Sequence, residues 1–125
     1  MMVYIASPYS DPAPGVVQDR YFSVMHFFSW LVKQPGYQKS FIFSPIIHNH
    51  PTALRYGLPT DAEFWKQYNF QIITACTHVL ILRIPGWDRS IGARMEIDFC
   101  KEAGKTLMQA YWSDDKETYK VGPFV

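Results

Sequence analysis

The sequence has almost no excess of charge of either sign. Twelve Lys and Arg residues oppose 11 Asp and Glu residues, and the formal net charge is +1 at pH 7. Because binding to long nucleic acid or to an anionic membrane surface depends on concentrated positive charge, this balance argues against both partners. It does not exclude a small anionic substrate, which needs only a few local donors.

Cysteines and long apolar runs are also scarce. Cys76 and Cys100 are the two cysteines, and they lie in segments expected to be helical, without metal-site spacing. We therefore expect reduced, buried thiols in a cytoplasmic protein. The N-terminus has no basic region and only a short apolar run, unlike a signal peptide. No stretch approaches the roughly 18 apolar residues of a membrane span, so we expect no membrane partner.

Aromatic residues, by contrast, are abundant, at 17% of 125 residues. A chain of this length suffices for one domain with one core, and we assign residues 1–125 to it. So many aromatic side chains favour a pocket as well as a core. The segment 16–33 is expected to be a helix that is apolar around most of its circumference, with Phe22 and Trp30 outside its core face. Such a helix is either deeply buried or packs on a partner subunit.

Segments with strand-like and helix-like patterns alternate along the chain. Short apolar runs bounded by Gly, Pro and polar residues predict strands, and apolar residues three or four apart predict helices. The predicted order is strand 2–6, helix 16–33, strand 41–44, helix 61–76, strand 78–83, helix 90–101 and strand 105–110. This alternation indicates an α/β fold, a single-domain Rossmann-like or flavodoxin-like parallel sheet with helices on both faces.

Ligands of such folds bind beyond the carboxyl ends of the strands. The expected loops are 7–15 and 46–51, and a polar exit follows the last strand at 111–115. The segments expected around this crevice are 7–11, 48–51, 85–92 and 111–113. In the first loop, serines and exposed amides can hold a hydroxyl or phosphate. Arg20 could reach back to this loop, but we expect it on the surface. His48 and His50 alternate in the second loop, with no further ligand at metal spacing, so we expect pocket-lining residues and no metal.

Residues 86–104 carry the strongest functional signal. Ser90 can cap a helix that ends at Gly104. Gly92 precedes Glu96 by one turn, and a larger residue there would compete for the space into which Glu96 points. Spacing alone leaves two interpretations. Either Glu96 is a catalytic carboxylate with cleared space, or it is a solvated residue in a helix whose glycine merely allows close packing.

The preceding helix, over 61–76, is expected to begin with a capping box formed by Thr60 and Glu63. Asn69 follows Trp65 by about one turn. The expected core face of this helix is formed by Phe64, Tyr68, Ile72 and Ala75, and Trp65 and Ile73 widen it.

Four stretches carry a resemblance to a known family. They are Val3-Tyr4-Ile5-Ala6-Ser7-Pro8, Phe43-Ser44-Pro45-Ile46-Ile47-His48, residues 61–65, and Ser90-Ile91-Gly92-Ala93-Arg94-Met95-Glu96-Ile97. In their order and spacing they resemble the nucleoside 2-deoxyribosyltransferase superfamily, which includes the 2′-deoxynucleoside 5′-monophosphate N-hydrolases and small uncharacterised bacterial and phage relatives. The resemblance implies that Glu96 is the nucleophile that attacks the anomeric carbon and that Tyr4 orients it. The substrate-binding residues it implies are Ser7, Tyr9, His48, Asp61, Trp65, Arg89, Ser90 and Gly92.

Two positions refine this expectation. At the position of Ser90 the transferases usually carry an aspartate, which accepts a hydrogen bond from the sugar 5′-hydroxyl. The monophosphate hydrolases carry a serine there, which donates a hydrogen bond to the phosphate. A serine at a helix N-terminus favours a 5′-monophosphate, and Arg89 could add charge, although Ser90 could be only a cap. Asn69 stands where the family usually has an aspartate that helps to protonate the base, and an amide cannot act as an acid. Either Asp61, Asp88 or a loop group takes that role, or the enzyme is slow, or the position was altered.

The leading expectation is an N-glycosidase that cleaves the base–sugar bond of (2′-deoxy)nucleoside 5′-monophosphates through a covalent intermediate on Glu96. A nucleoside 2-deoxyribosyltransferase and a catalytically silent nucleotide-binding protein are the alternatives. The resemblance further implies a homo-oligomer and a reaction that needs no metal or organic cofactor.

Overall fold

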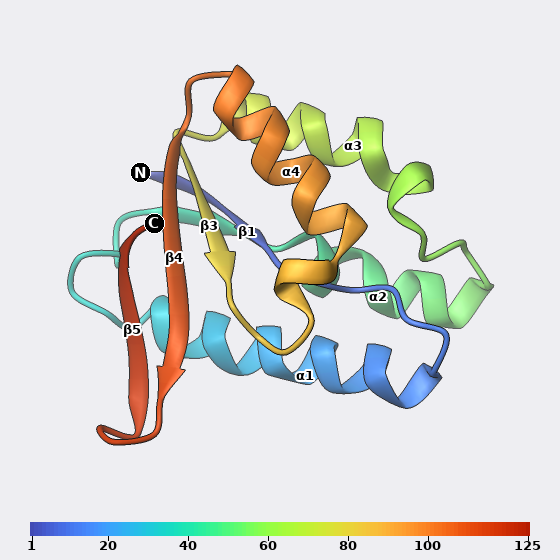
Figure 1. Ribbon diagram of the computed structural model, residues 1–125, viewed down its shortest axis with the longest axis horizontal. Helices are drawn as coiled ribbons and strands as arrows, with labels where there is room; N and C mark the ends of the chain where they lie inside the picture. The colour runs from blue at the N-terminus through green and yellow to red at the C-terminus, as the bar shows by residue number, and fades with distance from the viewer.

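The computed structural model describes every residue from Met1 to Val125. Strands and helices alternate from the N-terminus onward (Figure 1). In chain order they are β1 (Met2–Ala6), α1 (Pro14–Leu31), β2 (Phe41–Phe43), α2 (Pro45–Tyr56), α3 (Ala62–Ala75), β3 (His78–Leu82), a 3-10 turn (Trp87–Arg89), α4 (Ile91–Glu102), β4 (Thr106–Ser113) and β5 (Thr118–Pro123). The predicted Rossmann-like α/β fold is confirmed.

One sheet contains all five strands, in the order β2-β1-β3-β4-β5. The first four strands are parallel, and β5 is antiparallel to β4. After β1 the chain moves to one side to form β2 and then returns to the other side to form β3. The order therefore reverses at β1, and the crevice at such a reversal is where open α/β sheets bind ligands.

Two helical layers cover the sheet. On one face, α1 packs on Val3 and Ile5 of β1, and on the other face α3 and α4 pack on Tyr4 and Ala6. Figure 1 shows α1 on the opposite side of the sheet from α3 and α4. Because side chains alternate along a strand, a strand buried on both faces is apolar throughout, as β1 is. The same alternation directs Tyr4 towards α4.

The second predicted loop is a helix instead. Ser44 caps α2 by accepting a hydrogen bond from the Ile47 amide at 3.2 Å, and Pro45 occupies the first turn, where a missing N–H does no harm. The helix contains Pro51 and ends at Gly57, whose φ is +66°. The prediction of a loop over 46–51 was wrong, because a Ser-Pro start and an interior proline resemble loop signals.

The start and the core face of α3 also differ from the prediction. Asp61, not Thr60, caps the helix by accepting from the Phe64 amide at 3.1 Å. Ile73 is fully buried, whereas Phe64 and Tyr68 are 51% and 42% exposed. Sequence spacing placed these two aromatic residues on the core face, but α3 turns a different side towards the sheet and α4.

The C-terminal segment contains a hairpin that the sequence did not reveal. β4 continues to Ser113 rather than ending before a polar exit at 111, and β5 then pairs with it. Tyr119 and Val121 of β5 alternate and pack against the α1 side of the core. A one-sided edge strand of this kind has only two inward residues and therefore gives a weak pattern.

None of the helices combines the length and apolar character that crossing a membrane requires. The aromatic surface of α1 is only partly buried in the monomer, since Phe22 stays 56% exposed. Cys76 and Cys100 are both free and buried, as predicted.

Candidate functional site

A cleft of about 610 Å³, including its open mouth, lies between the first loop, α2, α3 and the start of α4. Eight of the residues expected at the site line it, namely Ser7, Tyr9, Asp61, Trp65, Asn69, Ser90, Gly92 and Glu96. Residues distant in the sequence thus meet where the sheet topology favours a ligand.

Glu96 is the central carboxylate of this cleft. It lines the cavity, yet its side chain is only 7% exposed. The hydroxyl of Tyr4, itself fully buried in β1, donates a hydrogen bond to Oε2 of Glu96. The interpretation of Glu96 as a solvated helix residue is therefore wrong.

Burial also changes the acidity of Glu96. Loss of solvent raises the pKa of its carboxyl from 4.5 to about 8, although hydrogen bonds from Tyr4 and from the Asn69 side chain act in the opposite direction. The pKa of Tyr4 is raised well above its usual value, by burial and by the neighbouring Glu96. Tyr4 thus keeps its proton and remains a donor to the carboxylate.

Two buried polar atoms of the cleft have no hydrogen-bond partner. They are Oγ of Ser7 and Oδ1 of Asn69, and both residues line the cavity. An unsatisfied buried polar group costs about 1–3 kcal/mol, so such groups are rare unless a ligand satisfies them. The pair therefore indicates a polar ligand in the cleft.

Ser90 and Gly92 form the start of α4. Ser90 Oγ accepts from the Ala93 amide at 3.1 Å, which is the predicted cap, and its own hydroxyl proton stays free to donate. A Cβ added to Gly92 would lie 3.3 Å from Cβ of Ala62. Gly92 therefore allows α3 and α4 to approach closely. A Cβ alone at this position meets no side-chain atom of Glu96 within 4 Å. That a larger residue there would compete with Glu96 for space stays a prediction.

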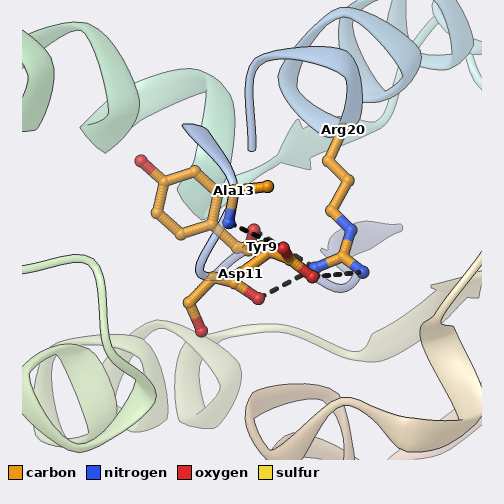
Figure 2. A network of polar contacts seen from close by, with 5 residues as sticks. Tyr9, Asp11, Ala13 and Arg20 are labelled. Carbon is orange, nitrogen blue, oxygen red and sulfur yellow. Dashed lines mark hydrogen bonds and ion pairs between the residues drawn. The ribbon is translucent and has the colours of Figure 1, made fainter. Parts of the chain in front are cut away.

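Arg20 holds the first loop in place (Figure 2). Its Nη1 donates to the carbonyl oxygens of Tyr9 at 3.4 Å and Ser10 at 2.9 Å, and its Nη2 lies 3.9 Å from Oδ2 of Asp11. Asp11 also accepts from the Ala13 amide at 2.9 Å. With a side chain only 14% exposed, Arg20 is not the surface residue that we predicted.

The two histidines of α2 point in different directions because they lie on a helix rather than on an extended loop. His48 is exposed and stacks near Tyr68, outside the cleft lining. His50 does not line the cleft either, so the predicted place of both histidines in the pocket lining was wrong. His50 is 5% exposed and contacts Tyr9 through Nδ1 at 2.5 Å and Gln18 through Nε2 at 3.0 Å.

The basic residue of the cleft is also not the predicted one. Arg89 is exposed in the 3-10 turn and does not line the cavity, whereas Lys66 does. Lys66 lies three residues before Asn69, so helical spacing places both residues on one side of α3. This spacing could have indicated that Lys66 lines the cleft. Asn49 is a second lining residue that the sequence reading missed, and finding it required recognising α2 as a helix.

The fold and the site together define a Rossmann-like α/β domain with a buried carboxylate at the ligand-binding end of its sheet. The chain belongs to the family described as Domain of unknown function (DUF1937), which it matches over residues 1–112. That span includes every cleft residue named above. A comparison with curated proteins found no match.

Proposed function

We propose that this protein is an N-glycosidase that cleaves the base–sugar bond of (2′-deoxy)nucleoside 5′-monophosphates. The observation that carries the proposal is the buried Glu96 carboxyl, held by Tyr4 and lining a cleft that also presents Ser7, Asn69 and Ser90. A resemblance to the nucleoside 2-deoxyribosyltransferase superfamily supports the same chemistry, since Glu96 and Tyr4 occupy the matching positions.

In the proposed reaction an ionised Glu96 oxygen forms a bond to the anomeric carbon while the bond from that carbon to the base nitrogen breaks. Water later attacks the same carbon and releases the sugar phosphate. With a pKa of about 8, Glu96 is mostly protonated at pH 7 in the free site. Ionising it there costs about 1.4 kcal/mol, a modest amount against the rate enhancements of enzymes.

The phosphate would lie at the start of α4. There the Ser90 hydroxyl can donate, and the helix N-terminus favours an anion. Lys66 is the basic side chain of the cleft lining, so it replaces Arg89 as the proposed counter-ion. The wall of the cleft also carries Trp65, which offers a flat surface to a base.

A second subunit is part of the proposal. Phe22 and Met25 on α1 are 56% and 40% exposed, and Trp112 at the end of β4 is 46% exposed. Exposed apolar side chains of this size favour a homo-oligomer. Free, buried cysteines support a reducing, cytoplasmic environment.

The test is to incubate the protein with a panel of deoxynucleosides and their 5′-monophosphates and to measure free base by chromatography. Glu96→Gln is the inactivating variant, and Glu102→Gln, an exposed glutamate on the same helix, is the matched control. Base released from monophosphates by the wild type and the control, but not by Glu96→Gln, is the expected result.

Two other results would replace the proposal. Exchange of bases between unphosphorylated nucleosides would make the protein a transferase, in which Ser90 is only a cap. Tight nucleotide binding without any base release would make it a binding protein.

A further inference from the structure

A chain of three hydrogen-bonded side chains begins at the cleft and runs into the protein. Tyr9 lines the cavity, and its hydroxyl lies 2.5 Å from Nδ1 of His50. On the far side of the ring, Nε2 of His50 lies 3.0 Å from Oε1 of Gln18. These three residues come from the first loop, α2 and α1, so the fold brings them together from separate segments.

The partners fix the protons of this chain. A glutamine carbonyl oxygen can only accept, so Nε2 of His50 carries a proton. In the neutral ring Nδ1 then accepts, and the Tyr9 hydroxyl donates to it. When the ring gains a second proton, Nδ1 becomes the donor and the Tyr9 proton is free to turn towards the cleft.

The surroundings of His50 allow both protonation states. Burial lowers the pKa of His50 and raises that of Tyr9, which favours the neutral pair in the empty site. The ring of Tyr21 lies 4.5 Å from the His50 ring, centre to centre, and an aromatic face stabilises an imidazolium. Gln18 accepts from Nε2 in either state.

The proposed glycosidase lacks an acid for the departing base. A retaining mechanism needs one group that first donates a proton and later accepts one. Asn69 cannot do this, and the carboxylate of Asp61 is engaged as the cap of α3, where it accepts from a backbone amide. Of the remaining cleft residues, Tyr9 is the one whose hydroxyl is connected to a histidine.

We propose that Tyr9 donates the proton to the departing base and that His50 restores it. This inference rests on the proposed function. As the bond between the anomeric carbon and the base breaks, the Tyr9 proton moves to the base nitrogen and the Nδ1 proton of His50 moves to the Tyr9 oxygen. When water then attacks the glycosyl ester of Glu96, a water proton moves to Tyr9 and the Tyr9 proton moves to Nδ1. Glu96 ends ionised and His50 ends doubly protonated, which are the charge states that the two groups have in the substrate complex when the first step begins.

The test compares two substrates that differ only in the leaving group. One is a purine deoxynucleoside 5′-monophosphate, and the other is its N7-methylated form, whose base leaves as a neutral molecule without being protonated. Tyr9→Phe is the test variant. Tyr56→Phe is its matched control, because it also removes one tyrosine hydroxyl but lies exposed at the end of α2, outside the cleft lining.

We expect Tyr9→Phe to slow base release from the ordinary nucleotide by about 100-fold or more, the usual contribution of an acid catalyst. From the methylated nucleotide it should release the first equivalent of base within a few-fold of the wild-type rate. Hydrolysis of the glycosyl ester should then be slow in Tyr9→Phe, so the sugar phosphate should stay attached to Glu96, where mass spectrometry can detect it. His50→Gln, which keeps a hydrogen-bonding side chain but carries no mobile proton, should show the same leaving-group dependence. Tyr56→Phe should behave as the wild type.

Equal losses on the two substrates would assign Tyr9 to binding and overturn the inference alone. The same holds if Asp61→Asn, rather than Tyr9→Phe, shows the leaving-group dependence. If the wild type releases no base from either substrate, the proposed function itself is overturned, so the two failures are distinguishable.

Discussion

Replacing Glu96 by Gln should stabilise the protein, and the gain should grow with pH. The folded-state pKa of Glu96 is about 8 against 4.5 for the free side chain. Between these values the folded state holds a proton that the unfolded state has lost, so wild-type stability falls by about 1.4 kcal/mol for each pH unit. The stabilisation that the protonated Glu96 carboxyl gives to the folded state is fully present below pH 4.5, and it is lost as pH rises through 8. From pH 5 to pH 7 the loss amounts to about 3 kcal/mol.

Urea unfolding of the wild type and Glu96→Gln at pH 5, 6, 7 and 8 measures this effect. The difference between the two free energies of unfolding cancels every other titrating group, and glutamine keeps an oxygen that can accept from Tyr4. We expect the free energy of unfolding of Glu96→Gln, minus that of the wild type, to increase by about 3 kcal/mol from pH 5 to pH 7. Above pH 8 this difference should level off. A difference that does not change with pH would show that Glu96 titrates normally, and the picture of a desolvated carboxyl would fail. Glu102→Gln, at an exposed position, should give a flat difference.

Three further predictions concern the surroundings of that carboxyl. Tyr4→Phe removes a hydrogen bond to the ionised Glu96 carboxylate, so the pKa of that carboxyl should rise further. Base release at pH 7 should then fall by about tenfold or more, which pH–rate profiles would measure. Asp61→Ala should lower the free energy of unfolding by about 0.5–2 kcal/mol through loss of the α3 cap, and Thr60→Ala should lower it much less. Equal effects of the two variants in urea unfolding would contradict Asp61 as the cap. Lys66→Ala should raise KM for a nucleoside 5′-monophosphate by about tenfold and leave KM for the unphosphorylated nucleoside unchanged. A larger rise in KM for Arg89→Ala would show that Arg89 is the counter-ion of the phosphate.

The sequence predicted best those parts of the fold that local patterns determine. β1 and β3 are short apolar runs buried on both faces, and α4 has a clear cap at Ser90 and a stop at Gly104. These elements agree with the prediction to within about a residue. They also carry the central carboxyl and the strand tyrosine that contacts it, so the centre of the candidate site could be read from the sequence.

The parts that were missed depend on contacts between distant segments. The helix α2 contains a proline and begins with one, so its local signals suggested a loop, and the contact between His50 and Tyr9 was invisible without it. Which side of α3 faces the sheet is decided by its packing on α4, where the rings of Phe70 and Phe99 stack 4.1 Å apart. Periodicity reveals that a helix has an apolar side, but α3 has aromatic residues on more than one.

The guanidinium of Arg20 has a consequence for how this chain can be varied. Gly86 follows β3 with a φ of +95°, and a Cβ added there would lie 2.4 Å from Nη2 of Arg20. Any larger residue at position 86 would both strain the backbone and push away the group that fastens the first loop. Arg20 therefore keeps its position only while residue 86 is glycine, although the two residues lie far apart in the sequence. A library that randomises position 86 should therefore return mainly glycine, because a Cβ there strains the backbone whatever residue stands at position 20.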